Sequence, residues 1–409
     1  MYKSELILSW GKTSKKQIDF VEHIDEGEII LPIGNLNSYG DSCIPKNKLA
    51  FKLRKQNIAN TTICEYIQDS SLRLFGIPGK SNVTIAGAIA SDVHGKDNLW
   101  GGSFSKNIDK LELLIANNKK IEISRKENNE LFQATIGGLG LTGVITDIEI
   151  SKKLKKLPSF VETKVTKGEG FEDLFNSFKF QNSTYWSSWV DLIGRKNKWV
   201  SFTSTELNTD NFKTEEFNLN PNFNKNKFSL NLSNKVFLKN LNYIYNAIHR
   251  NKVKNNHIFN TFYPIKSFLD TRLISGSDGL VQIQFVVPES KNLEIKPLVQ
   301  LLTEHNTPIL CSVKRLHDSE GYLSFCTNGW TLAVDFSKKN FNPKNLEKFF
   351  LKLTSIGGRI YLAKDSLLDE KSFYSMYPEF ETWKKVVNYY DSSNLFQSEM
   401  STRLNLKPW

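Results

Sequence analysis

The chain has 409 residues, of which 39% are hydrophobic and 12% aromatic, and its formal net charge is +11. At roughly 100–200 residues per domain, this length predicts two or three domains, and the aromatic content excludes a disordered or fibrous chain. The basic balance favours an anionic partner, such as nucleic acid, a phosphorylated substrate or an anionic membrane. Its densest clusters, at 152–156 and 249–254, are by themselves typical of solvated surface.

Several other classes of protein are excluded by the same sequence. No apolar run approaches the roughly 18 residues of a membrane span, and no signal peptide is recognised at the start. The four cysteines and six histidines show neither CxxC nor HxxxH spacing, which argues against a disulfide framework and against a metal site. We therefore expect a cytoplasmic protein that holds no metal.

Glycine-rich turns alternate with short strands in the first third of the chain. Glycine and asparagine tolerate the backbone conformations of tight loops, and alternating apolar residues mark the strands. The elements expected there are a strand at 28–32, a tight loop at 34–41, a glycine-rich segment at 79–102, strands at 108–116 and 120–124, a helix at 128–133, a glycine run at 137–143 and a strand at 144–150.

The remainder of the chain alternates strands with helices. The elements expected there are a helix at 171–178, strands at 185–192 and 199–205, a long mobile loop at 206–234, a helix at 236–249, a strand at 279–288, a helix at 297–305, a strand at 331–336, a helix at 345–355, a strand or strand end at 359–365, and short helices at 372–377 and 379–390. This alternation suggests an antiparallel sheet covered by helices.

The glycine loops are the part of the sequence that points to chemistry. The backbone N–H groups of such loops can hold a phosphate, because no side chain keeps the anion away. The Walker A pattern is absent. The segment 138–143 imitates GxGxxG but leads into a strand instead of a helix, so a nicotinamide-binding Rossmann fold is disfavoured.

Several segments together carry a resemblance to a known family. They are 34–41, 78–96 with its AGAIASDVHGK run, 101–104, 130–143, 282–288, 357–365 with GGRIYLAKD, and 373–378. In this order, and over nearly the whole chain, they resemble the vanillyl-alcohol-oxidase-type (PCMH-type) FAD flavoproteins. Within that group they are most similar to the decaprenylphosphoryl-β-D-ribose 2′-oxidase branch.

The resemblance implies an α+β flavoprotein of two domains. Residues 1–153 plus 357–409 would form a PCMH-type FAD-binding domain, and 154–356 an inserted antiparallel-sheet domain that holds the substrate. Between Asp41 and Gly79 the chain is shorter than the family pattern, which carries a further strand and helix there. The segment before Gly34 also looks trimmed, so we expect a shortened FAD domain.

The resemblance also assigns residues to the cofactor. The pyrophosphate would be wrapped by Gly34, Asn35, Asn37, Ser38 and Tyr39. The rest of FAD would be lined by Gly79, Ser81, Thr84, Gly87, Ser91, His94 and Gly95, with Val144 and Tyr361 beside it. Asn37 stands where covalently flavinylated relatives carry histidine, so we expect non-covalent FAD. For Cys43, a small buried residue is a better interpretation than a flavin linkage, and His94 is also compatible with a core histidine.

Lys364 is the catalytic residue that the resemblance implies. From the residues alone it ends a strand on the same face as Ile360 and Leu362, where an exposed lysine is the ordinary interpretation. The resemblance implies instead that it holds the substrate hydroxyl beside the flavin. To act as a base it must have a lowered pKa, because a free lysine is protonated at pH 7.

The expected substrate contacts each have a structural alternative. Gln282 and Gln284 share one face of a strand and would bind sugar hydroxyls, or would form a solvated face. Lys96 would meet a phosphate or hydroxyl, or lie on a surface loop. Trp189 would form an apolar pocket wall, or a core side chain. Thr331 and Ala333 stand where mycobacterial-type members of the family carry asparagine and cysteine.

The activity that the resemblance implies is oxidation of a secondary hydroxyl in a polyprenyl-phosphoryl pentose to its 2-keto form. A short-chain NAD(P)H reductase would complete an epimerisation that makes a cell-wall polysaccharide precursor. The basic surface fits peripheral contact with the inner membrane, and no nucleic acid is expected. Two alternatives stay open, a soluble aldonolactone or alditol oxidase and a non-enzymatic flavin- or polyanion-binding protein.

Overall fold

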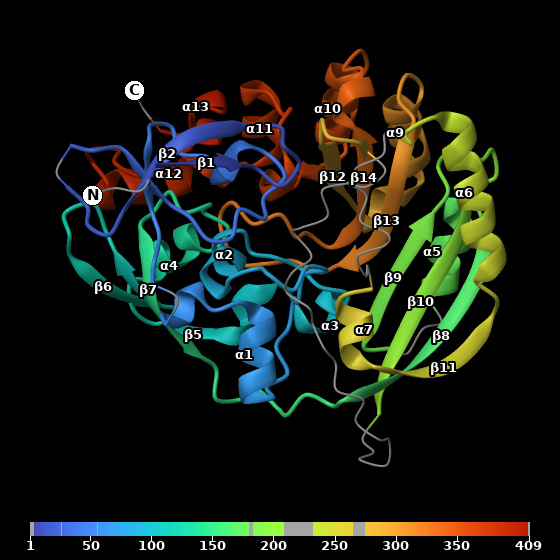
Figure 1. Ribbon diagram of the computed structural model, residues 1–409, viewed down its shortest axis with the longest axis horizontal. Helices are drawn as coiled ribbons and strands as arrows, with labels where there is room; N and C mark the ends of the chain where they lie inside the picture. Colours follow the sequence, from blue (N-terminus) through green and yellow to red (C-terminus); the bar gives the residue numbers. More distant parts are fainter. Residues whose placement is uncertain are drawn as a thin grey trace.

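An eight-stranded antiparallel sheet forms one side of the molecule (Figure 1). The computed structural model describes residues 4–25, 27–54, 56–179, 183–207, 232–264 and 275–407. The strands of this sheet, in spatial order, are β11 (Lys252–His257), β8 (Phe160–Glu169), β10 (Lys198–Leu207), β9 (Tyr185–Val190), β13 (Pro308–Leu316), β14 (Gly329–Ser337), β12 (Leu280–Pro288) and β15 (Arg359–Ile360). Every neighbouring pair is antiparallel, which confirms the expected antiparallel sheet.

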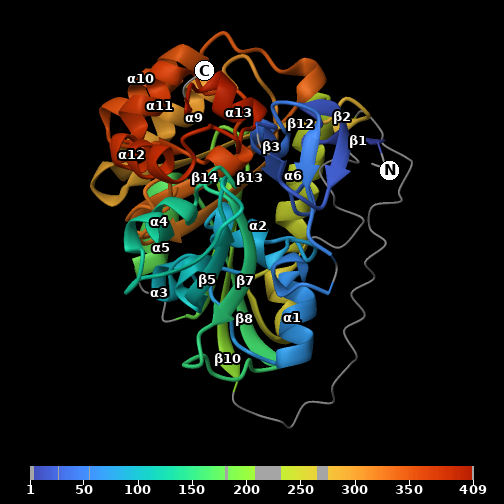
Figure 2. The ribbon, with the colours of Figure 1, turned by 90° about the vertical axis from the view of Figure 1, so that its left-hand side faces the viewer.

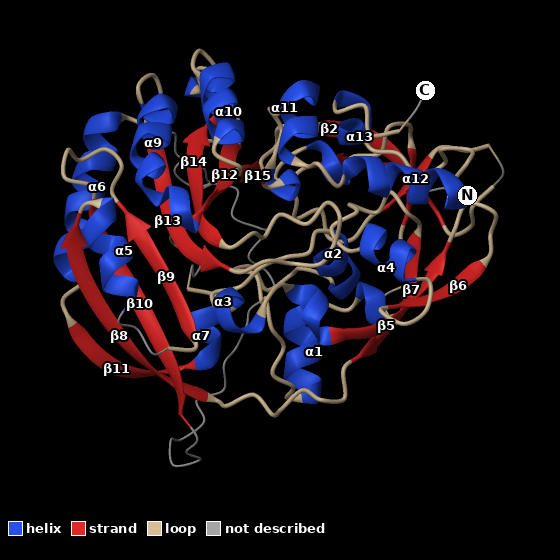
Figure 3. Cartoon of the chain, turned by 180° about the vertical axis from the view of Figure 1, so that it is seen from behind, coloured by secondary structure: helices blue, strands red, loops and turns tan. Residues whose placement is uncertain are grey.

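The two faces of this sheet differ in chemistry, because side chains alternate along each strand. One face is apolar and is covered by α5 (Phe171–Lys179), α9 (Ile295–Thr303) and α10 (Leu346–Ser355). The ring of Phe175 in α5 lies 4.4 Å from that of Trp330, and Phe349 in α10 lies 5.3 Å from Phe285. The other face is partly covered by α6 (Lys235–Ile248), so that α5 and α6 lie on opposite sides of the sheet (Figure 3).

Two smaller sheets form the other side of the molecule (Figure 2). The four-stranded sheet has the order β1 (Ser4–Leu8), β2 (Lys15–Val21), β4 (Leu49–Phe51) and β3 (Ile30–Pro32). The three-stranded sheet has the order β6 (Lys120–Ser124), β5 (Ile108–Leu114) and β7 (Val144–Ile150). The predicted strands at 108–116, 120–124 and 144–150 are therefore confirmed.

Short helices connect and cover these sheets. In chain order they are α1 (Ile63–Ser70), α2 (Ile85–Ala90), α3 (Asn98–Gly101), α4 (Asn129–Thr135), α7 (Ile258–Phe262), α11 (Glu370–Met376), α12 (Phe380–Tyr390) and α13 (Glu399–Arg403). Local capping fixes where several begin. Thr62 and Glu65 form a capping box at α1, and the Thr84 side chain caps α2. Among the helices of the described residues, none has the length and apolar content needed to cross a bilayer.

The last part of the chain returns to the first. Phe396 forms a parallel bridge with Ile30, and Ser398 forms an antiparallel bridge with Pro45. The indole of Trp383 donates a hydrogen bond to the carbonyl of Ala134, 3.0 Å away. Helices α11 to α13 therefore pack among the small sheets, and β1 and α13, near the two ends of the chain, lie on the side opposite the large sheet (Figure 1).

Three expectations from the sequence differ from the structure. The segment 79–102 is not loop throughout, because Thr84 begins the helix α2. The segment between Asp41 and Gly79, for which no strand or helix was predicted, contains β4 and α1. The residues 359–365 do not form a strand up to Lys364. Strand β15 ends at Ile360, and Leu362–Lys364 form a 3-10 turn.

Strands β1, β2, β8, β11 and β13 were also not anticipated. Of these, β8 and β13 alternate buried and less buried residues as amphipathic strands do. The long loop predicted at 206–234 lies for the most part, at 208–231, outside the described residues.

Candidate active site

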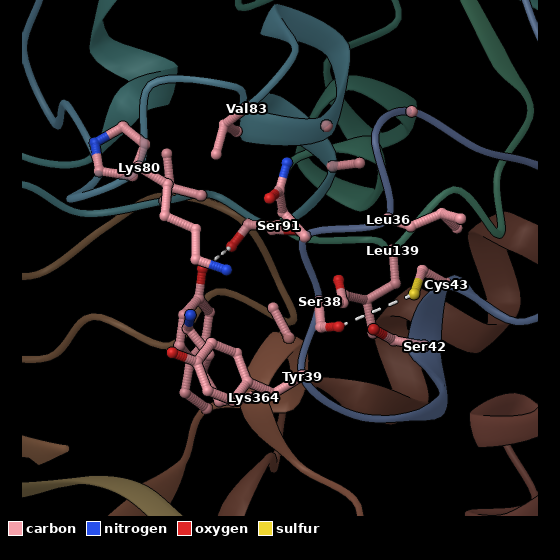
Figure 4. Close-up of a pocket in the computed structure, with 18 of the residues that line it drawn as sticks. Leu36, Ser38, Tyr39, Ser42, Cys43, Lys80, Val83, Ser91, Leu139 and Lys364 are labelled. Carbon is pink, nitrogen blue, oxygen red and sulfur yellow. Dashed lines mark hydrogen bonds between the residues drawn. The ribbon is translucent and has the colours of Figure 1, made fainter. Parts of the chain in front are cut away.

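A pocket of about 290 Å³ lies between the glycine-rich loops and the polar face of the large sheet (Figure 4). Most of the residues expected at a cofactor and substrate site line it. They are Gly34, Asn35, Asn37, Ser38, Tyr39, Gly79, Thr84, Gly87, Ser91, His94, Gln282, Gln284, Thr331, Ala333, Tyr361 and Lys364. These residues are separated by up to 330 positions in sequence, and the fold brings their side chains and backbone groups together in one pocket.

Strand register explains why the sheet presents polar groups to this pocket. Gln284 of β12 is paired with Ala333 of β14, and Ser312 of β13 is paired with the same residue. Lys314 is paired in turn with Thr331. Because neighbours in register point to the same face, these side chains form one polar patch against the pocket. Gln284 is only 5% exposed, which excludes a solvated strand face there.

The first glycine loop presents a row of backbone donors. Among the described residues, none of the five N–H groups from Gly34 to Ser38 donates to another protein atom. The side-chain amides of Asn35 and Asn37 both donate to the carbonyl of Asn82, at 2.9 and 3.0 Å, and so tie the two glycine-rich segments together. Consecutive unpaired amides beside a cavity are suited to an anionic group such as a pyrophosphate.

The shape of the loops leaves room for such a group. A Cβ atom added at Gly34 would lie 2.5 Å from the Thr84 hydroxyl oxygen, so a larger residue would disturb the loop. A Cβ added at Gly79 would meet no atom within 4 Å, because Gly79 faces open space in the pocket. The side-chain oxygens of Asn37 and Ser42 are buried here without a hydrogen-bond partner among the described residues. Buried polar atoms of this kind fit a polar ligand.

Lys364 lies on the 3-10 turn directly after β15. Its amine is 3.9 Å from the centre of the Tyr39 ring, and Figure 4 shows the two side chains together. Tyr39 is held by a hydrogen bond from its N–H to the carbonyl of Ala363, at 3.1 Å. Burial, together with the positive charge of Lys314, lowers the pKa of Lys364 to about 7, against an opposing influence from Asp335. A large share of Lys364 is therefore neutral at pH 7.

A hydrogen-bonded group beside Lys364 contains a neutral histidine. The Nε2 atoms of Gln284 and His94 are 2.7 Å apart, and Gln284 also donates to the Thr331 hydroxyl at 3.2 Å. Burial, followed by the charges of Lys314 and Lys364, holds the pKa of His94 well below its usual range. His94 is therefore uncharged at neutral pH and positions Gln284 without adding charge.

This arrangement can be compared with known proteins. No protein-family model matches the chain. The decaprenylphosphoryl-β-D-ribose oxidase of Mycolicibacterium smegmatis is 30% identical over 353 residues, which cover 81% of this chain and 75% of that protein. The chain belongs to the decaprenylphosphoryl-β-D-ribose oxidase family. It is thus an oxidoreductase, and the resemblance found in its sequence is confirmed.

A second relative covers a similar share of the chain. An uncharacterized protein in the mprA 5′ region of Streptomyces coelicolor is 24% identical over 360 residues, 80% of this chain and 95% of that protein.

Lys314 is a pocket residue of this family member that the sequence did not reveal. It lies on β13, which was not predicted, and faces the same pocket as Lys364. Burial lowers its pKa to about 8, with Cys326 and Asp97 opposing that shift. The signal was present in the alternation of buried Cys311 and Val313 with polar Ser312 and Lys314.

Three residues of this chain that were expected to contact the cofactor do not line the main pocket. Ser81 and Gly95 lie outside it. At Gly95 an added Cβ would lie 2.3 Å from a carboxylate oxygen of Asp97, so this glycine serves close packing. Val144 lines an adjoining pocket of about 70 Å³ that shares Gly34 and several loop residues with the main one.

Two expected substrate residues are also elsewhere. The amine of Lys96 donates to the carbonyl of Thr261 in α7. Burial and the charge of Lys314 lower the pKa of Lys96 to about 7. Trp189 is paired with Ser312 and shares its face of the sheet, but the ring of Tyr245 in α6 lies 4.7 Å from it. Trp189 therefore packs against α6 and is not among the residues that line the pocket.

Cys43 lines the pocket as a half-buried thiol. Burial raises its pKa to about 12. The thiol is therefore protonated at neutral pH and is a poor nucleophile.

Proposed function

We propose that this family member is an FAD-dependent oxidoreductase that oxidises a secondary hydroxyl of a polyprenyl-phosphoryl pentose to its 2-keto form, as half of an epimerisation. One observation carries the proposal. The N–H groups of Gly34–Ser38, which donate to no other atom of the described residues, and the partly neutral Lys364 line the same pocket. An anion-binding loop beside a candidate base is the arrangement that a flavin-dependent alcohol oxidation requires.

FAD fits the residues of this pocket. The amides of Gly34–Ser38 would hold the pyrophosphate, and the open space at Gly79 leaves room for it. His94 and Tyr361, whose rings are 5.7 Å apart, would lie beside the rest of the cofactor. With no histidine in this loop, we propose that FAD is held without a covalent bond.

A PCMH-type division of the chain is part of the same proposal. Residues 1–153 plus 357–409 would bind FAD, and 154–356 would hold the substrate. The return of the last part of the chain to the first, through the bridges at Ile30 and Pro45, supports this division.

In the proposed reaction Lys364 takes the hydroxyl proton on its Nζ, while the carbon that carries this hydroxyl loses a hydride. FAD, when bound, supplies the acceptor for that hydride. Gln284 and Thr331 would hold neighbouring sugar hydroxyls, because their polar groups face the pocket from the sheet. Lys314 would place its positive charge near the phosphodiester of the substrate.

A visible absorption spectrum of the purified protein, taken before and after acid precipitation, tests the cofactor. We expect flavin bands that move to the supernatant. Bands that remain with the pellet would overturn the non-covalent assignment. A colourless protein that takes up no added FAD would overturn the flavin proposal itself.

Anaerobic mixing with a short polyprenyl-phosphoryl ribose tests the substrate. We expect loss of the oxidised flavin band and formation of a ketone. The soluble-oxidase alternative instead predicts oxygen uptake with free alditols or aldonolactones and no reaction with the lipid-linked sugar. Reduction by free sugars alone would therefore replace the proposed substrate class.

A further inference from the structure

The surface formed by α6 and the adjoining strand β11 exposes an unusual amount of apolar area. Five of the twelve large hydrophobic side chains that are exposed among the described residues lie on α6. They are Val236, Phe237, Tyr243, Ile244 and Ile248. Tyr243 is 72% exposed and Ile244 54%. Soluble proteins seldom expose such side chains together to water, so a patch of this kind indicates a surface that binds a partner.

Helix geometry places these residues in one stripe. Positions 236, 240, 243, 244, 247 and 248 follow the spacing of a single helical face, and Asn240 is the one polar residue among them. The opposite face of α6 is used for packing. Leu238 is buried against Leu280 and Tyr39, with Leu241 beside them. Helix α6 therefore has two apolar faces. Among the described residues, the face that carries Leu238 is covered, and the face that carries Tyr243 and Ile244 is exposed.

The charge around the stripe has a single sign. From 232 to 264 the chain carries five lysines or arginines and no aspartate or glutamate. The cations are Lys235, Lys239, Arg250, Lys252 and Lys254, which include the cluster noted at 249–254. Strand β8, next to β11, carries two acids. Glu169 is paired with Lys196. Glu162 is paired in register with Asn255, so its side chain lies on the face of the sheet opposite to Lys252 and Lys254. The α6–β11 surface, defined by the apolar residues and cations named above, is thus apolar and strongly positive.

We propose that the α6–β11 surface lies on an anionic lipid bilayer, with α6 parallel to the membrane plane. Apolar side chains on one helical face with flanking lysines and arginines are the features of interfacial helices, which combine apolar burial with attraction to acidic lipids. Figures 1 and 3 show α6 as an outer element of the molecule, free of other helices on its outward side.

A second copy of the chain fits this surface less well than a membrane does. In a two-fold dimer the same patch meets itself, so five cations would face five cations without an intervening acid. A bilayer with acidic head groups removes that conflict. In this orientation the pocket would lie close to the bilayer. Leu238, on the inner face of α6, packs with Tyr39, which lines the pocket.

Vesicle co-sedimentation of the full chain tests this inference without any substrate, so its outcome is independent of the sugar chemistry. Wild-type protein is mixed with phosphatidylglycerol vesicles and with phosphatidylcholine vesicles. The test variant is Ile244→Glu, with Lys252→Gln/Lys254→Gln as a second variant. The matched control is Leu351→Glu on α10, because Leu351 is also 54% exposed and receives the same charge.

We expect binding to phosphatidylglycerol vesicles that weakens with salt, and little binding to phosphatidylcholine. Ile244→Glu should weaken binding to phosphatidylglycerol vesicles at least about tenfold, and the Lys252→Gln/Lys254→Gln variant should weaken this binding by a similar factor. Leu351→Glu should leave the binding unchanged. Equal loss in Ile244→Glu and Leu351→Glu, or no binding by the wild type, would overturn the proposal. So would a wild-type dimer in light scattering that Ile244→Glu converts to monomer. Circular dichroism of each variant shows whether weaker vesicle binding comes from the changed surface or from unfolding.

Discussion

Two lysines, Lys314 on strand β13 and Lys364 on a 3-10 turn, share the pocket, and the charge of Lys314 affects the ionisation of Lys364. Lys364 has its pKa lowered to about 7 by burial and by Lys314, while burial lowers the pKa of Lys314 to about 8. At neutral pH the second lysine therefore keeps more of its proton than the first. In the proposed reaction the pair would separate two tasks, proton acceptance by Lys364 and a positive charge at Lys314.

Replacing Lys364 by alanine should abolish reduction of the flavin by substrate while the protein stays yellow. The amine is the candidate base, and loss of a positioned base costs about 10²- to 10⁴-fold in rate. Stopped-flow absorbance measures this rate. The parallel variant Lys96→Ala serves as a comparison, because Lys96 bonds Thr261 outside the pocket lining. Retained reduction in Lys364→Ala would reject the catalytic role.

The neutral form of Lys364 is the reactive one, so flavin reduction by the wild type should increase with pH through about 7. Replacing Lys314 by methionine removes a positive charge that lowers the pKa of Lys364. The pKa of Lys364 should then rise, and the pH profile should move to higher pH. The single-turnover rate as a function of pH measures this shift. An unchanged profile would show that the two amines do not interact.

Elements of the site differ in how well local sequence predicts them. The glycine loop at 34–41 and strands β5, β6 and β7 follow from residue type and alternation, and the sequence places them correctly. The 3-10 turn at Leu362–Lys364 and helix α2 were missed because short apolar runs suit strand, helix and turn alike. The position of Lys314 opposite Thr331 depends on pairing between distant strands, which no local pattern encodes.

Two glycines of the loops should respond differently to alanine. At Gly40 an added Cβ would lie 1.5 Å from the carbonyl oxygen of Asp365, so Gly40→Ala must push the loop from the Lys364 turn. We expect a loss of about 1–3 kcal/mol in unfolding free energy. Gly79→Ala meets no atom within 4 Å and should unfold like the wild type, yet bind flavin more weakly.

Denaturant unfolding and flavin titration of both glycine variants measure these effects. Reduced stability in Gly79→Ala, or unchanged stability in Gly40→Ala, would contradict the assignment of one glycine to packing and the other to the pocket wall.

On the scale of the whole molecule, Arg403 connects distant parts of the site. Its guanidinium donates to both carboxylate oxygens of Asp41 at 2.8 Å, to Asp365 at 2.9 Å and to the carbonyl of Leu368. Asp41 follows the first glycine loop, and Asp365 follows Lys364. One side chain from α13 thus links the first glycine loop to the turn that carries Lys364.

Replacing Arg403 by methionine should lower the unfolding free energy by about 2–4 kcal/mol, because two buried carboxylates lose their partner. Flavin affinity should fall together with stability. Arg403→Lys should recover only part of the loss, since lysine cannot form the paired contact with Asp41. The control is Arg54→Met, which removes an exposed ion pair with Glu22. It should change neither the unfolding free energy nor the flavin affinity. Normal flavin binding by a folded Arg403→Met protein would contradict this role.

The contact between Arg403 and Asp41 also sets an order of events during synthesis. The two residues are 362 positions apart, and a ribosome adding about 5–20 residues per second needs about 20–70 s to travel between them. During that interval the glycine loop has already emerged, but its guanidinium partner has not been made. A nascent chain therefore lacks this contact between the first glycine loop and α13 until translation has passed Arg403, whatever its earlier segments have already formed.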